Sequence, residues 1–296
     1  MSLNRIKPLP TASGVAVAKT ATFDIPIGPR YKVIWLEAGD TAKDLVTDII
    51  GDIRLKVNGK VQRTMSAAEL IAINSMMGVN GEYSEALELD GIGVGAGHVL
   101  KTRLPIFLSE PWRAQLAVAD GLAWGTADLA SFQVEVDIKA AAAGPTLDGF
   151  VEADYTTVTD AKGVQQQPRM GVICKWFRQQ IPINGTTQDV TTLPRRDFYQ
   201  QISLFDSAIT NVIVETDSLI QRDLTKVRND DILVSRQMVP DDTRYDVVFD
   251  YDDLITSGLP MVLNGRPVTD FQLKLTLSDG TARNISTIIQ RLGPPE

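Results

Sequence analysis

Two strongly alternating segments, one in each half of the chain, constrain the fold more than any other feature. Residues 132–138 read FQVEVDI and residues 271–277 read FQLKLTL. In both segments an apolar residue occupies every second position, which is typical of a β-strand with one buried face. Polar residues fill the alternate positions, with Glu135 and Asp137 in the first segment and Lys274 in the second. This similarity suggests that the chain contains the same kind of domain twice.

A second pair of segments supports an internal repeat. Ile53–Met65 can be laid on Val212–Leu224 without gaps, so that the turn Asn58-Gly59 meets the turn Asp217-Ser218. Asn-Gly between alternating residues is a strong β-hairpin signal. A short helix is predicted after each hairpin. The first covers residues 66–77, with Ser66 as N-cap and Glu69 as its capping-box partner, and the second covers residues 223–230.

We therefore predict an all-β chain made of two tandem jelly-roll β-sandwiches, a double jelly roll, with short helices in the loops. Its 296 residues are enough for two ordinary domains. The predicted division is an extended N-terminal arm at 1–20, a first jelly roll at 21–145 and a second at 146–296. Residues 132–138 would close the first sandwich, and 140–145, ending in Gly144-Pro145, would link it to the second.

Composition excludes several classes of protein. The formal net charge is −8, which argues against a broad basic face for duplex DNA and predicts no sequence-specific nucleic acid partner. No apolar run reaches the roughly 18 residues of a membrane-spanning helix. The single cysteine, Cys174, lies in an apolar run. A single cysteine cannot form an internal disulfide, which fits folding in a reducing cytoplasm. Because of its apolar neighbours, Cys174 is predicted to be buried.

No catalytic constellation emerges, and the chain is predicted not to be an enzyme. His98 is the single histidine, and it follows a glycine-rich stretch at 91–97. A dinucleotide-binding loop needs a helix directly after its glycines, whereas residues 99–108 have the pattern of a strand. We therefore interpret this stretch as a surface loop and predict no required cofactor.

One acidic cluster is a candidate metal site. Asp250 and Asp252 would share a face of an extended chain, with Asp253 beside them. Carboxylate oxygens arranged in this way can bind Ca²⁺. A solvated acidic turn is the simpler interpretation, and both remain open.

Three groups of residues resemble one protein family in their order and spacing. They are Pro26-Ile27-Gly28 leading into Tyr31–Leu36; the alternating strand at 132–138 running into Ala141–Pro145; and Trp176-Phe177-Arg178 followed by Asn184–Thr187 and Leu193-Pro194-Arg195. Together they resemble the major coat proteins of corticovirus-type bacteriophages, which are tailless, icosahedral phages with an inner membrane. The resemblance spans roughly residues 20–290.

The resemblance implies a structural major capsid protein of a virion. Such a protein forms homotrimers with a pseudo-hexagonal outline, which pack with neighbouring capsomers into an icosahedral shell over an inner membrane and a genome. Penton and membrane-associated virion proteins are further implied partners. Arg5 and Lys7 make the arm mildly basic. The arm could therefore lie near anionic lipid head groups or clamp a neighbouring subunit.

Two other functions are consistent with tandem β-sandwiches. One is a carbohydrate-binding or carbohydrate-active protein, which would need aromatic platforms beside carboxylates. Aromatic residues make up 6% of the chain, and Tyr251 is the one placed in this way. The other is an accessory virion spike.

Overall fold

The computed structural model describes residues 5–43, 46–77, 100–113, 119–155, 157–159, 163, 165–250, 258–263 and 265–296. Within them the chain is mostly β-strand, with short helices α1 (Val46–Ile49), α2 (Ala67–Met76) and α4 (Lys226–Ser235). It divides into two units. The first comprises residues 1–175 with 294–296, and the second comprises residues 176–293.

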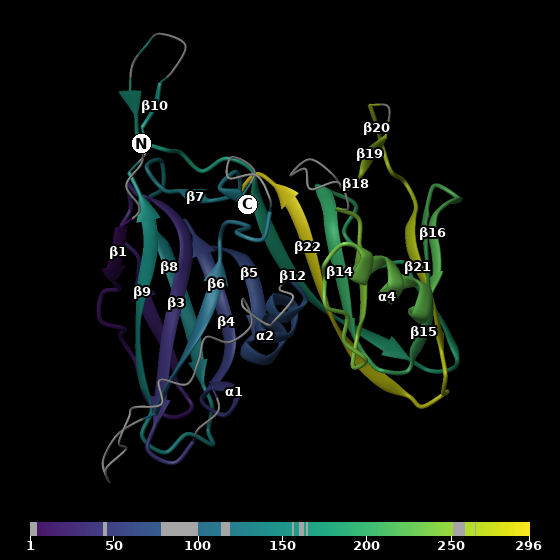
Figure 1. Ribbon diagram of the computed structural model, residues 1–296, viewed down its shortest axis with the longest axis horizontal. Coiled ribbons are helices and arrows are strands. Elements are labelled where there is room, and N and C mark those ends of the chain that lie inside the picture. The colour runs from purple at the N-terminus through teal and green to yellow at the C-terminus, as the bar shows by residue number, and fades with distance from the viewer. Residues whose placement is uncertain are drawn as a thin grey trace. The chain divides into compact units, whose positions relative to one another are not determined.

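The first unit consists mainly of two four-stranded antiparallel sheets (Figure 1). One has the strand order β1-β9-β3-β6 and the other β2-β8-β4-β5. The bounds are β1 (Arg5–Pro8), β2 (Thr20–Asp24), β3 (Arg30–Asp40), β4 (Ile50–Val57), β5 (Lys60–Ser66), β6 (Leu100–Phe107), β8 (Phe132–Ile138) and β9 (Thr146–Asp154). The short β7 (Trp124–Gly125) pairs with β3, and β10 (Val158–Thr159) pairs with β11 (Gln165–Gln166).

The second unit also has two four-stranded sheets, in the orders β12-β22-β14-β17 and β13-β21-β15-β16. The bounds are β12 (Ile173–Ile183), β13 (Thr187–Val190), β14 (Phe198–Phe205), β15 (Ile209–Thr216), β16 (Leu219–Thr225), β17 (Tyr245–Val248), β21 (Phe271–Leu277) and β22 (Arg283–Gly293). Three two-residue strands complete it. β18 (Leu259–Pro260) pairs with β14, and β19 (Val262–Leu263) pairs with β20 (Arg266–Pro267).

The two units have the same topology. Among the eight longer strands of each, one sheet contains the first, eighth, third and sixth, and the other contains the second, seventh, fourth and fifth. This interleaved antiparallel order is that of a jelly roll. The prediction of an all-β double jelly roll is therefore confirmed, and the segment pairs of the predicted repeat occupy equivalent strands: β4-β5 with β15-β16, and β8 with β21.

The two hairpin turns match in detail. Asn58 and Gly59 have φ values of 50° and 79°, and Asp217 and Ser218 have 47° and 66°. Positive φ at both central residues is what a type I′ turn requires. The Oδ1 atom of Asn58 accepts hydrogen bonds from the backbone N–H groups that precede β8, and Oδ1 of Asp217 accepts them from those that precede β21. The turns are thus tied to equivalent strands.

Equivalent aromatic pairs join the two sheets in each core. The rings of Tyr31 and Phe132 are 5.7 Å apart, and those of Tyr199 and Phe271 are 4.9 Å apart. The two phenylalanines are the first residues of the alternating segments, and each is 1% exposed. Both tyrosine hydroxyls donate to the backbone carbonyl of a proline five residues earlier. Burial raises the pKa of both hydroxyls, which keeps them protonated as donors.

The outward faces of the alternating segments carry ion pairs of opposite polarity. In the first unit Lys56 of β4 lies 2.5 Å from Glu135 of β8. In the second unit Glu215 of β15 lies 2.6 Å from Lys274 of β21. These positions are equivalent in the repeat, so the cation and anion have exchanged strands. Partly exposed pairs like these contribute about 0–1 kcal/mol each, and either polarity satisfies the same cross-strand contact.

The predicted domain boundary at residue 145 is wrong. β9 follows it and pairs with β3 and β1, so residues 146–154 belong to the first unit, and the division lies between Lys175 and Trp176. Residues 140–145 do not link two sandwiches. They form the corner at which the chain passes from one sheet of the first unit to the other. The closing strand of this unit is therefore β9 and not the segment 132–138.

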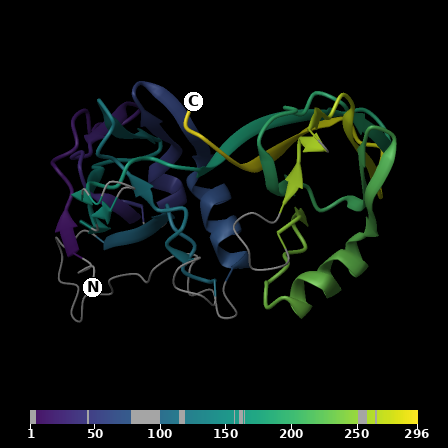
Figure 2. The same ribbon diagram turned by 90° about the horizontal axis from the view of Figure 1, so that it is seen from above.

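Two smaller predictions also need correction. The helix expected at 223–230 begins at Lys226, because residues 219–225 form β16, and it continues to Ser235. In Figure 2 this helix is the green coiled ribbon of the second unit. The N-terminal arm is not separate from the first jelly roll, since residues 5–8 pair with β9 as strand β1.

Two other local predictions, the capped helix α2 and the buried cysteine, are confirmed. Ser66 caps α2, and Glu69 completes the capping box. Cys174 is buried. None of the helices in the described ranges is long and apolar enough to cross a membrane.

The carboxylate of Asp40 holds the corner at 140–145 in place. Its Oδ2 accepts hydrogen bonds from the N–H groups of Ala143 at 2.9 Å and Gly144 at 3.0 Å, and its Oδ1 accepts one from Ala42 at 2.8 Å. Burial by itself would raise the pKa of Asp40. The backbone donors, which include Lys43, outweigh this effect and lower the pKa below its usual value.

Replacing Asp40 by asparagine should destabilise the protein by about 2 kcal/mol at pH 7, because one of two acceptor oxygens becomes an NH₂ group facing backbone N–H donors. A carboxyl with a depressed folded pKa stabilises the native state above its unfolded pKa of about 4 and loses this effect as pH falls through the folded pKa. Urea unfolding at pH 7 and pH 3 should therefore show the wild-type advantage narrowing in acid. An equal difference at both pH values would contradict this role.

Candidate assembly surfaces

Of the three predicted calcium ligands, Asp250 lies within the described residues. Asp250 follows β17, and one of its carboxylate oxygens lies 3.4 Å from Nε2 of Gln200. Asp252 and Asp253 lie outside the described residues, as do the glycine-rich stretch at 91–97 and His98. Within the described ranges, no group of three or more His, Cys, Asp or Glu side chains is arranged to hold a metal ion. The calcium site therefore stays a prediction.

The basic arm forms the end strand β1 of its sheet. Arg5 and Lys7 lie against Tyr155, with the guanidinium carbon 4.9 Å and the ammonium nitrogen 5.1 Å from the ring centre. The Lys7 ammonium also donates to the Tyr155 hydroxyl at 3.1 Å. Ile6 alternates with these residues and is 70% exposed. An end strand with an exposed apolar side chain is a natural site for pairing with another chain.

A second exposed apolar surface lies in the other unit, on the end strand β16 and the helix α4 that follows it. Leu219 and Ile220 of β16 are 63% and 61% exposed, and Val227 and Val234 of α4 are 71% and 61% exposed. We call these four residues the β16–α4 patch. Single exposed aliphatic residues are common, but four on one strand–helix module point to an interaction surface.

The equivalent module of the first unit, β5 with α2, is more buried. Gln62 is 3% exposed, whereas its counterpart Gln221 is exposed. The side-chain oxygen of Gln62 accepts a hydrogen bond from the N–H group of Glu296 at 3.0 Å. The guanidinium of Arg63 donates to the carbonyl of Cys174 at 2.8 Å. Residues 173–175 and 294–296 therefore cover the part of β5 whose counterpart in β16 is exposed.

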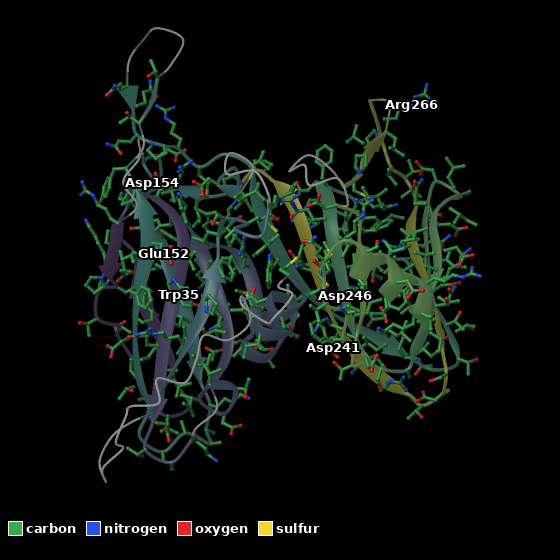
Figure 3. The ribbon with its side chains drawn as sticks, in the orientation of Figure 1. Trp35, Glu152, Asp154, Asp241, Asp246 and Arg266 are labelled. Atoms are coloured by element: carbon green, nitrogen blue, oxygen red, sulfur yellow. The ribbon has the colours of Figure 1, made fainter. Side chains whose placement is uncertain are left out.

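A third surface lies on the sheet β1-β9-β3-β6, on the side away from its core. Trp35 stacks on Phe150 with ring centres 5.6 Å apart, and its indole N–H donates to Glu152 at 2.9 Å. Figure 3 shows Trp35 and Glu152 together on this sheet. All three side chains are half-buried. This aromatic face is a further surface at which another molecule could pack.

Sequence analysis singled out Arg5 and Lys7 but none of the residues of the β16–α4 patch. One signal was present. In the alignment of the two hairpins, Gly59-Lys60-Val61 meets Ser218-Leu219-Ile220. Directly after the turn, Leu219 therefore stands where the first hairpin has Lys60. A pair of apolar residues at the start of an end strand favours an interface.

The comparisons with known proteins agree with this architecture. The family model for the viral coat protein P2 N-terminal domain matches residues 6–154, and the model for the viral coat protein P2 C-terminal domain matches residues 173–295. These ranges correspond to the two jelly rolls. A search of curated proteins gives no match.

Solved structures of viral capsid proteins share the fold. The major capsid protein P2 of bacteriophage PM2 superposes with a TM-score of 0.78 at 19% identity, covering 99% of this chain and 98% of that one. A capsid structure of PBCV-1 gives 0.71 at 10% identity, covering 99% and 94%. A chain in the atomic structure of Sulfolobus turreted icosahedral virus gives 0.67 at 13% identity, covering 99% and 91%.

The family consists of structural proteins of viral coats, in agreement with the prediction that the chain is not an enzyme. Both family domains are present, in order, and they account for nearly all of its length. The chain therefore belongs to the viral coat protein P2 family.

Proposed function

We propose that this protein is the major capsid protein of a virion and that it assembles as a homotrimer with a pseudo-hexagonal outline. One observation carries the proposal: a member of a viral coat family contains two jelly rolls with the same strand order. A ring of three such chains contains six similar units. A closed three-fold assembly can then occupy a six-neighbour position in a shell.

The trimers would pack with neighbouring capsomers, and with penton and membrane-associated virion proteins, into an icosahedral shell over an inner membrane. The resemblance to corticovirus-type coat proteins supports this part of the proposal. The basic arm has two candidate partners, anionic lipid and a neighbouring subunit. Because β1 is an end strand with Ile6 exposed, we favour the subunit.

Light scattering coupled to size-exclusion chromatography tests the oligomer. The expected mass is about three times the 32.3 kDa of one chain. A monomer at micromolar concentration would contradict the proposal.

The same measurement in the presence of a chelator tests whether the trimer depends on calcium. A lower mass in EDTA would support a bound cation at Asp250, Asp252 and Asp253, and an unchanged trimer would remove calcium from the account.

A further inference from the structure

We propose that the contact that closes the trimer is formed by strand β1 of one copy and the β16–α4 patch of the next. This inference rests on the trimer proposed above and names the surfaces that build it. The occupant of the patch is thus a second copy of this chain, contacted through residues 5–8.

The internal repeat carries the argument. β5 and β16 occupy equivalent positions in the repeat, and β16 is the end strand of its sheet. In the first unit, β5 is covered by residues 173–175 of the same unit, through the hydrogen bond from Arg63 to Cys174. Residues 173–175 are the first residues of β12, and β12 is the counterpart of β1 in the repeat. The strand that should cover β16 is therefore β1, and a second copy can supply it.

The two surfaces have matching chemistry. β1 presents Ile6 at 70% exposure, and β16 begins with the exposed pair Leu219 and Ile220. The exposed charged side chains of β1, Arg5 and Lys7, are basic, whereas that of β16, Asp223, is acidic. Contact would bury apolar side chains on both partners and bring opposite charges together.

The proposed contact is also of a kind that can close into a ring. β1 and β16 are different surfaces, so the contact is head-to-tail, and an open assembly keeps one unused surface of each kind, one at each end. The assembly closes into a ring when the rotation between successive copies lets the last copy meet the first. With two similar units per chain, closure after three copies gives six units around the axis.

Charge substitutions at the patch test the contact. Ile220→Lys places a cation opposite the basic strand β1, and Ile6→Lys places one opposite Leu219 and Ile220. Each should raise the concentration at which half of the trimer dissociates by about tenfold or more. Val262→Lys is the matched control, because Val262 is 56% exposed on β19, and it should leave the mass unchanged. Circular dichroism of each variant checks that it is folded.

Disulfide trapping gives a readout that does not depend on weakening the trimer. Ile6→Cys is combined in turn with Leu219→Cys, Ile220→Cys and Gln221→Cys, while Val262→Cys serves as the control partner. We expect non-reducing gels to show cross-linked dimers and trimers for at least one of the β16 positions. The control pair with position 262 should give no cross-link. A wild-type trimer that persists in both lysine variants and forms no cross-link at any β16 position would overturn the proposed contact and leave the trimer intact. A monomeric wild type would overturn the proposed function itself.

Discussion

Replacing Phe132 by alanine is expected to lower the free energy of unfolding of the first unit by about 3–5 kcal/mol, the cost of removing a buried phenylalanine ring from a packed core. Phe132 is 1% exposed and contacts Tyr31 and Trp124, with ring centres 5.7 Å and 5.5 Å apart. The substitution leaves a cavity between the two sheets. Denaturant unfolding followed by tryptophan fluorescence measures the effect, because Trp35, Trp112 and Trp124 all lie in the first unit.

The repeat provides a matched experiment in the second unit. Phe271→Ala should have a similar cost, since Phe271 is also 1% exposed and packs on Tyr199 at 4.9 Å. Phe198→Ala is the control, because Phe198 is 46% exposed and its loss should cost less than about 1 kcal/mol. Equal costs at positions 132 and 198 would contradict the assignment of the alternating segments to the cores.

The second large effect is expected at Arg63, where Arg63→Met should lower the free energy of unfolding by about 3–5 kcal/mol. The side chain is 2% exposed and donates to the carbonyls of Cys174 at 2.8 Å and Phe107 at 2.6 Å. Methionine fills similar volume but leaves both buried carbonyls without this donor. Burial lowers the pKa of the guanidinium, yet arginine remains charged at neutral pH, so these are charge-assisted hydrogen bonds.

Lys60→Met is the control for Arg63→Met, because it removes a positive charge from the same strand at an exposed position. It should change the free energy of unfolding by less than about 0.5 kcal/mol. The counterpart of Arg63 in the repeat is Arg222, which donates to Val248 and Asn229. Arg222→Met should therefore destabilise the second unit. A change below about 1 kcal/mol at Arg63 would show that its hydrogen bonds do not hold β5 in place.

Local signals predicted strands best where one face is buried and the other is not. The segments 132–138 and 271–277 are strands with the predicted bounds, and every second residue is buried. The I′ turn at Asn58-Gly59 and the capping box of α2 were also predictable, because each depends on residues close together in sequence. These local features, repeated in order, were sufficient to predict a double jelly roll.

The domain boundary was missed because local signals do not say which sheet a strand joins. Gly144-Pro145 marks a break in regular structure, and such a break fits a domain linker and a corner between sheets equally well. The corner is specified by Asp40, whose carboxylate binds the N–H groups of Ala143 and Gly144 from far away in the sequence. A contact of this range leaves no periodic signature.

The candidate assembly surfaces were harder to predict for a similar reason. Val61 and Ile220 are equivalent aliphatic residues in equivalent strands, and neither residue type distinguishes a covered strand from an exposed one. The difference arises at the next position, where Gln62 is buried by contact with Glu296. Whether an apolar residue belongs to a core or to an interface therefore depends on segments distant in sequence.

Class averages of negatively stained particles viewed along the symmetry axis test the central claim most directly. We expect a closed ring of three chains with a six-sided outline and six lobes of similar size, because each chain contributes two jelly rolls. A monomeric particle, or a trimer that projects as a single needle, would contradict it.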